Sequence, residues 1–264
     1  MGLELTTGLL DLFGAWAPWV ALAIARPFGF SVFFMAFQWA QVSTGMIRMA
    51  FAVALALPAL HFDPDGRAIS ELSMPFMATL AKEVAIGGFL GFIASVPLAI
   101  AVGAGGILDF YRGATQGMSD PSGGQVTAIS SLMAVTSLWI FASVGGFWTV
   151  SSIIYSSYAA WPVSSTFPVL AQGAGLVIDM IERIIAGSLF LCAPVLIILF
   201  ISDVVHLVSS KFGKNINVTH MAFSSKALIA VMVLPFFMLV AIQSMRSGYD
   251  WLNSVNDVMN RAFQ

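Results

Sequence analysis

The chain has 264 residues, of which 59% are hydrophobic and only 9% are charged, and its mean hydropathy is +0.91. Soluble domains carry about a quarter charged residues, so this composition argues against an ordinary soluble protein and predicts a polytopic membrane protein. The net charge of −2 comes without a basic tract, which argues against nucleic acid as a partner. The single cysteine, Cys192, excludes an intramolecular disulfide.

Apolar segments of helical length follow one another along the chain. A bilayer requires about 20 apolar residues per helix, and several long runs lack Asp, Glu, Lys and Arg altogether. The first residues carry acids at Glu4 and Asp11 and no basic stretch, so no cleaved signal peptide is expected. The pattern predicts helices at about 8–25, 28–45, 47–60, 75–108, 127–160, 168–209 and 216–245, then a short amphipathic helix at 250–263.

Three sequence features set the expected boundaries. Pro27, directly after Arg26, is expected to separate the first two helices, because proline cannot continue a helix. The pair Gly145-Gly146 is expected to divide the 127–160 segment. The segment SSKFGKN (209–215) carries two lysines and no acid, so the positive-inside rule places it on the cytoplasmic side.

The helix predicted at 75–108 carries a ladder of small residues at four-residue spacing. Such a ladder lets another backbone approach closely, either within this chain or in a neighbouring subunit, and the sequence leaves both readings open. Its members are Gly87, Gly91, Ser95, Ala99 and Gly103.

Ionisable residues inside apolar segments are functional candidates, because an unpaired charge is costly there. The candidate buried charges are Lys82, Glu83, Asp179, Glu182, Arg183 and Lys226. They are compatible with a proton relay or with ties between helices. Asp203 and His206 share a helix face without a third ligand, so no metal site is expected. No catalytic motif is present, and a non-enzymatic protein without a cofactor is predicted.

The polar segment DFYRGATQGMSDPSGGQ (109–125) interrupts this apolar background. Asp109 and Arg112 stand at i, i+3 and are expected to pair at the end of the preceding helix. Irregular backbone at membrane depth is tolerated only where protein or a watery cavity encloses it. The segment is therefore either a surface linker, which composition alone favours, or a closure element inside an assembly.

Four segments carry a resemblance to a known family. DFYRGATQGMSDPSGGQVT (109–127) contains an Asp-x-x-Arg-Gly-Ala pattern followed by Asp-Pro and a Gly-rich turn. IARPFGF (24–30), SYAAWPV (157–163) and NINVTHMAFSSKALIAV (215–231) complete the set. Their order and spacing resemble the SctT component of virulence type III secretion systems, which is the counterpart of flagellar FliR.

The resemblance implies an all-α export-gate subunit in the bacterial inner membrane. It implies one copy that assembles with SctR and SctS chains into a protein-conducting channel for unfolded substrates, next to SctU and SctV. Residues 1–160 would form N-terminal hairpins, and 168–245 a hairpin similar to an SctS subunit. The segment 113–124 would plug the pore through Gly113, Ala114, Gly117, Met118, Pro121, Gly123 and Gly124.

The resemblance reverses the preference for a surface linker. The alternative kept beside it is an independent proton-coupled secondary transporter. Its relay would consist of Asp179, Glu182, Arg183 and Lys226. An intramembrane enzyme ranks third.

Overall fold

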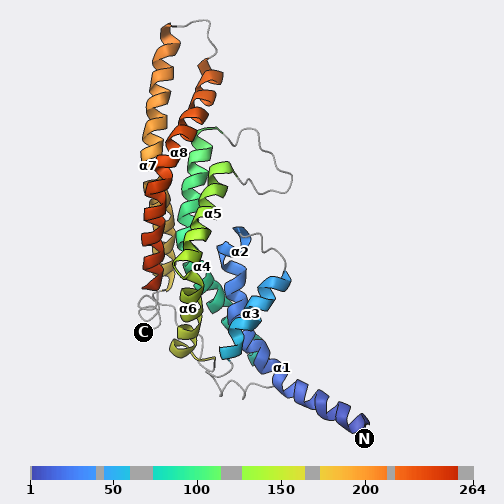
Figure 1. Ribbon diagram of the computed structural model, residues 1–264. Helices are drawn as coiled ribbons and strands as arrows, with labels where there is room; N and C mark the ends of the chain where they lie inside the picture. Colours follow the sequence, from blue (N-terminus) through green and yellow to red (C-terminus); the bar gives the residue numbers. More distant parts are fainter. Residues whose placement is uncertain are drawn as a thin grey trace. The chain divides into compact units, whose positions relative to one another are not determined.

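The computed structural model describes residues 2–39, 45–59, 74–113, 127–163, 173–212 and 218–254, and every regular element among them is an α-helix (Figure 1). The predicted all-α class is therefore confirmed. Contacts divide the chain into two units, Met1–Ser95 with Gly145–Val177 and Trp251–Gln264, and Val96–Val144 with Ile178–Asp250. The helices are α1 (Gly2–Phe33), α2 (Met35–Trp39), α3 (Gly45–Ala59), α4 (Met74–Tyr111), α5 (Ala128–Ser143), α6 (Gly146–Ala160), α7 (Gly173–Phe212) and α8 (Val218–Asn253).

In the first unit α1 packs along α3, and α3 also contacts α6 (Figure 1). The core of this unit consists of bulky side chains that are almost inaccessible, such as Leu22, Phe30 and Leu90. Phe34 lies between Phe30 and Phe37, with ring centroids 5.0 and 5.5 Å away. This aromatic stack holds the short α2 against the end of α1, where the chain leaves helical geometry.

The expected break at Pro27 is wrong, because α1 continues through this residue to Phe33. A proline inside a helix leaves the carbonyl four residues earlier without its backbone donor, here the carbonyl of Ala23. The hydroxyl of Tyr158 in α6 donates to that carbonyl at 3.0 Å. Because a side chain replaces the missing N–H, the helix tolerates the proline and continues beyond it.

Replacing Tyr158 by phenylalanine is expected to destabilise the fold by about 1–3 kcal/mol, because a buried carbonyl loses its donor. Adding Pro27→Ala supplies the missing backbone N–H, so the same tyrosine substitution should cost less in that background. A double-mutant cycle on the thermal stability of the purified complex measures this coupling. Equal costs in the two backgrounds would contradict the compensation.

The first two glycines of the small-residue ladder of α4 lie against α1. A Cβ atom at Gly87 would overlap the carbonyl oxygen of Arg26, and one at Gly91 would lie 2.6 Å from the carbonyl oxygen of Phe30. Both carbonyls belong to α1, so α4 and α1 touch backbone to backbone. The sequence left open whether the ladder packs within the chain or on a neighbour, and at these positions it packs within the chain.

The later members of the ladder have polar or partly open surroundings. Ser95 accepts the backbone N–H of Met35 at 2.9 Å, directly after the break that ends α1. A Cβ at Gly103 would lie 2.5 Å from the hydroxyl oxygen of Ser188 in α7, whereas Ala99 is half-buried.

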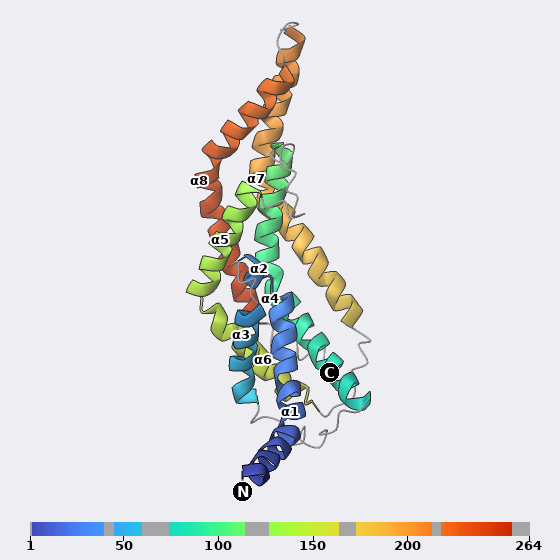
Figure 2. The same cartoon turned by 90° about the vertical axis from the view of Figure 1, so that its right-hand side faces the viewer.

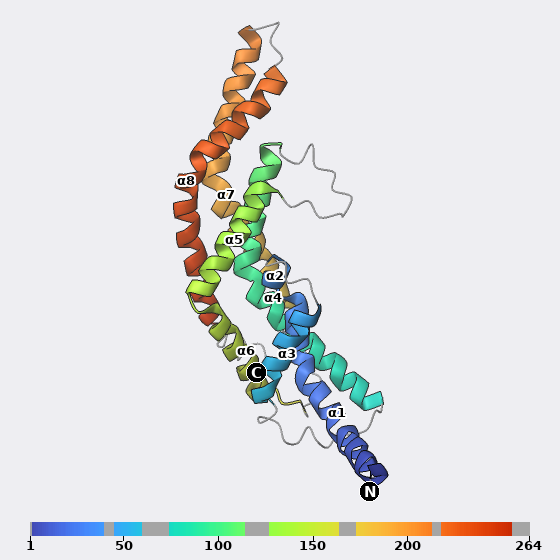
Figure 3. The same cartoon turned by 45° about the vertical axis from the view of Figure 1, so that its right-hand side comes forward.

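In the second unit, α7 and α8 run antiparallel (Figures 1 and 3). Asp203 of α7 pairs with Lys226 of α8 and connects the two helices. The expected division of the 127–160 segment is confirmed. α5 ends at Ser143 and α6 begins at Gly146, and Gly145 between them has a left-handed backbone with φ of +75°.

The predicted gap between 245 and 250 is wrong, since α8 is continuous to Asn253. Residues 255–263 of the predicted amphipathic helix lie outside the described residues.

Three helices of the described chain are long and apolar enough to cross a membrane, and α5 with α6 would supply a fourth as one broken span. Their burial differs. The most apolar stretch of α4 is 67% buried inside the chain, whereas those of α7 and α8 are only 28% and 22% buried. Figure 2 shows the two long helices α7 and α8. They present apolar side chains, among them Phe190, Leu207, Phe236 and Leu239, to lipid or to other subunits.

Candidate functional site

A fully buried arginine lies at the centre of the first unit. The guanidinium of Arg26 in α1 donates from Nε to Oε2 of Glu83 in α4 at 2.7 Å. Its two terminal nitrogens donate to the Ser157 hydroxyl at 3.0 Å and to the Trp161 carbonyl at 2.9 Å. The Tyr158 ring lies 4.0 Å from the guanidinium carbon, a cation–π contact. Each of the three guanidinium nitrogens therefore makes a hydrogen bond, and together these bonds join α1 to α4 and to the end of α6.

Lys82 is the second cation of this cluster. Its Nζ donates to the Val163 carbonyl at 2.7 Å and lies 3.3 Å from Oε1 of Glu83. That oxygen is within ion-pair distance of Nζ, but no donor of the described residues reaches it in hydrogen-bond geometry. Two buried cations thus share one carboxylate. Their excess positive charge faces carbonyls just beyond the C-terminal end of α6, where the helix dipole is negative and favours cations.

A second polar cluster lies in the second unit at the base of the 113–124 segment. Asp109, fully buried near the end of α4, accepts from Nε of Arg112 at 2.7 Å, so the two residues form the expected i, i+3 pair. Its other oxygen accepts the backbone N–H groups of Ile129 at 2.8 Å and Ser130 at 3.0 Å. The hydroxyl of Thr127, the residue before α5, makes no capping bond. Asp109 therefore caps α5 from across the intervening segment.

A third group of side chains connects the end of α4 to the α7–α8 pair. The Tyr111 hydroxyl donates to Oδ2 of Asp203 at 2.9 Å, and Nζ of Lys226 lies 2.8 Å from Oδ1 of the same carboxylate. Gly113 follows with a left-handed backbone, φ +79°, and a Cβ there would lie 2.7 Å from the Phe223 ring. The start of the 113–124 segment is thus fixed by both α7 and α8.

Most of the predicted plug lies outside the described residues, which include only Gly113. The undescribed positions are Ala114, Gly117, Met118, Pro121, Gly123 and Gly124. What the structure does describe is the helix ends on either side of the segment. Asp109 holds the end of α4 and the start of α5 together.

The candidate buried charges divide into two groups. Lys82 and Glu83 are buried, and Lys226 is mostly buried beside Asp203. Three others are exposed in this chain, which corrects the expectation that they are buried: Asp179, Glu182 and Arg183. They lie on the flank of α7 that other parts of the described chain leave uncovered.

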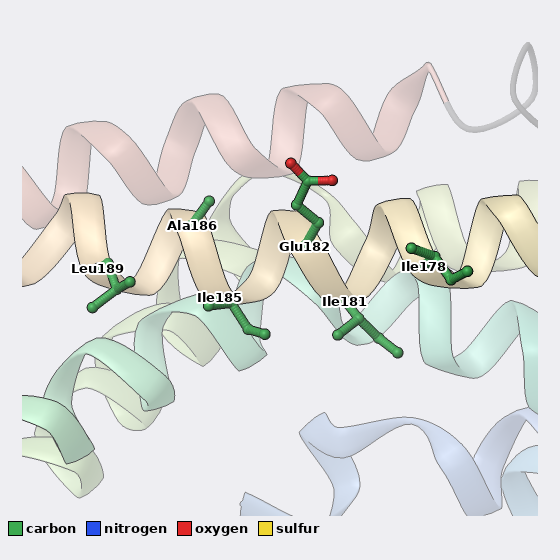
Figure 4. A pocket seen from close by; sticks show the side chains of 6 residues that line it. All are labelled: Ile178, Ile181, Glu182, Ile185, Ala186 and Leu189. Atoms are coloured by element: carbon green, nitrogen blue, oxygen red, sulfur yellow. The ribbon is translucent and has the colours of Figure 1, made fainter.

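Glu182 lies in an apolar environment despite its exposure. It lines an apolar pocket of about 440 Å³ on α7 (Figure 4), and the other lining residues are Ile178, Ile181, Ile185, Ala186 and Leu189. Figure 4 shows Glu182 and Ala186 projecting from one edge of the helix and Ile181, Ile185 and Leu189 from the other. A carboxylate amid such residues is costly in lipid.

Within the described chain no three His, Cys, Asp or Glu side chains come together as metal ligands. His206, considered with Asp203 as a possible pair, has its Nδ1 2.7 Å from the Ser202 carbonyl and its Nε2 3.1 Å from the Ser225 hydroxyl. It therefore helps to connect α7 to α8.

Comparison with known proteins assigns this arrangement to a family. Residues 18–250 match the family described as "Bacterial export proteins, family 1". The chain belongs to this family. It is 29% identical over 198 residues to "Yop proteins translocation protein T" of Yersinia pestis, covering 73% of this chain and 75% of that protein. It is 27% identical over 209 residues to "Surface presentation of antigens protein SpaR" of Salmonella typhimurium, covering 76% of each.

A more distant relative is "Secretion system apparatus protein SsaT" of Salmonella typhimurium, 21% identical over 223 residues, which covers 83% of this chain and 86% of that protein. These matches confirm the resemblance to the SctT/FliR family of type III secretion. The chain is therefore a multi-pass membrane subunit of a bacterial secretion apparatus.

Proposed function

We propose that the chain is a single-copy structural and gating subunit of the type III export gate in the bacterial inner membrane. It forms part of the channel through which unfolded proteins pass, and residues 113–124, the closure segment, close the pore. The observation that supports the proposal is the capping of α5 by Asp109, because it holds together the two helix ends that flank the segment.

The composition of the closure segment suits a protein-conducting channel. A seal in such a channel has to exclude ions and still yield to an unfolded chain. Four of its twelve residues are glycine, which permits many backbone conformations, and its only charge is Asp120. A segment of this kind offers a passing polypeptide few groups to bind.

The exposed surfaces of α7 and α8 support assembly with other subunits, which we propose to be SctR and SctS within the gate, next to SctU and SctV. The apolar stretches of α7 and α8 are mostly uncovered in the chain alone. Asp179, Glu182 and Arg183 interrupt the α7 face with charge. Charged groups at membrane depth normally face protein partners, so neighbouring subunits explain this surface better than lipid alone.

A secondary transporter does not fit the same geometry as well. Lys226, one member of the expected relay, pairs at 2.8 Å with Asp203, which is not one of the other expected members Asp179, Glu182 and Arg183. Co-purification discriminates the two functions, since a gate subunit is extracted together with its partners. Solute transport by the reconstituted lone chain would favour the transporter.

Deleting residues 113–124 is expected to leave the gate assembled but make the inner membrane permeable to small solutes. Asp109 and the start of α5 stay in the variant, so the helical framework is retained. The measurement is solute uptake by cells that contain the complete complex, with subunit recovery after mild detergent extraction as the control. A tight membrane around a fully assembled deletion variant would contradict the closure role.

A further inference from the structure

An uncovered flank of α7 holds one carboxylate among apolar side chains (Figure 4). Glu182 lines a pocket of about 440 Å³, the Glu182 pocket. None of the ion pairs among the described residues involves this carboxylate. The large apolar side chains around it are between 46% and 63% exposed, so other parts of the described chain leave them largely uncovered: Ile178, Ile181, Ile185 and Leu189.

The charged neighbours of Glu182 in α7 do not neutralise the pocket. Arg183 follows directly in the sequence, and consecutive residues of a helix do not face each other. Asp179 precedes Glu182 by three residues, shares its face of the helix and adds a second negative charge. Among the described residues, neither Arg183 nor Asp179 lines the pocket. Two acids and one base thus leave this flank with an excess of negative charge.

Neither lipid nor water suits this combination of groups. In hydrocarbon a carboxylate without a partner is costly, and in water the apolar side chains lose the free energy that their burial provides. Lysine and arginine satisfy both halves of the pocket, because their apolar stem lies along hydrophobic side chains and carries a cation at its end. The two halves are separate, since Glu182 projects from one edge of α7 and Ile181 and Ile185 from the other (Figure 4).

We propose that the Glu182 pocket receives a lysine or arginine side chain from an apolar helix of a neighbouring subunit. The aliphatic stem packs against Ile181 and Ile185, and the cation pairs with the Glu182 carboxylate. Ala186, one turn further along the same edge, is small and lets the partner helix approach closely. This inference rests on the proposed assembly with other subunits, and it adds the chemistry by which one of them is recognised.

Glu182→Gln gives results of opposite sign for a protein partner and for lipid. If the carboxylate pairs with a cation, the amide leaves that cation without a counter-charge, and we expect about tenfold less partner subunit per copy of this chain. If the carboxylate faces lipid, removal of its charge ends a cost, so recovery stays the same or rises. The measurement is the ratio of co-purified subunits to this chain after mild detergent extraction. Unchanged or higher recovery overturns the proposal.

Two further variants show whether the effect belongs to the pocket. Asp179→Asn makes the same change of acid to amide one turn earlier in α7, outside the pocket, and should leave recovery within about twofold of the unaltered chain. Glu182→Asp keeps the charge and should retain more partner subunit than Glu182→Gln. Equal losses for Asp179→Asn and Glu182→Gln would contradict a specific pair at residue 182.

A photo-reactive phenylalanine analogue in place of Ile185 identifies the occupant directly. In the purified complex we expect a cross-link to a peptide of another subunit that contains a lysine or arginine within an apolar stretch. A cross-link to lipid, a cross-linked peptide without a basic residue, or no cross-link at all contradicts the proposal. If the complex assembles and these results are negative, only the assignment of the pocket fails. If the unaltered chain is extracted without partners, the proposed assembly fails as well.

Discussion

Replacing Glu83 by glutamine is expected to reduce accumulation of the subunit strongly. The substitution is almost isosteric, but it leaves Arg26 and Lys82 buried without a counter-charge. Removing one partner of a buried ion pair costs about 3–5 kcal/mol, and domains are stable by only about 5–15 kcal/mol. The amount of intact complex recovered from membranes, and its resistance to heating, measure the loss.

A second substitution separates the electrostatic cause from a packing cause. Lys82→Met in the Glu83→Gln background restores the cluster's original net charge of +1, so the double variant should accumulate better than Glu83→Gln alone. Arg26→Met leaves a neutral pair of Lys82 and Glu83, and should be less harmful than Glu83→Gln despite its larger loss of volume. A double variant that is worse than both single variants would show that packing dominates.

The sequence predicted the helical class and the apolar segments well, because helix length and apolar runs are local properties. Pro27 shows where local reasoning stops. Helix propensity places a boundary there, yet the Tyr158 hydroxyl, 135 residues away from Ala23, satisfies the carbonyl that the proline leaves free. No pattern near residue 27 contains that information.

The same error concealed the central residue of the first unit. With a break at Pro27, Arg26 is expected at a helix end near the membrane surface. In the continuous helix it is buried against Glu83 and Ser157. The available signal was an arginine between two apolar stretches, the same criterion that identified Lys82. For Asp179, Glu182 and Arg183 of α7 the difference is the opposite one: they were expected to be buried, and they are exposed in this chain. Their burial depends on surfaces that this chain does not contain.

The contact between α1 and α4 has little room to adjust, because the Arg26–Glu83 pair holds the two helices together beside Gly87 and Gly91. A side chain at either glycine meets a backbone carbonyl, which cannot rotate away as a side chain can. Overpacking of this kind costs about 1–3 kcal/mol for small insertions, and a leucine adds more. The resulting strain acts inside the subunit before any partner binds.

Gly91→Leu is therefore expected to reduce recovery of the complex several-fold, and Gly87→Ala to reduce it less. Gly106 in the same helix is the matched control, because no atom of the described residues lies within 4 Å of the position that a Cβ would take there. Gly106→Ala should be neutral or stabilising by up to about 1 kcal/mol, since alanine favours a helix over glycine. The measurements are the amount of complex recovered after mild detergent extraction and its apparent melting temperature, compared among the three variants. Equal losses for Gly87→Ala and Gly106→Ala would show that close approach to α1 is not what these glycines provide.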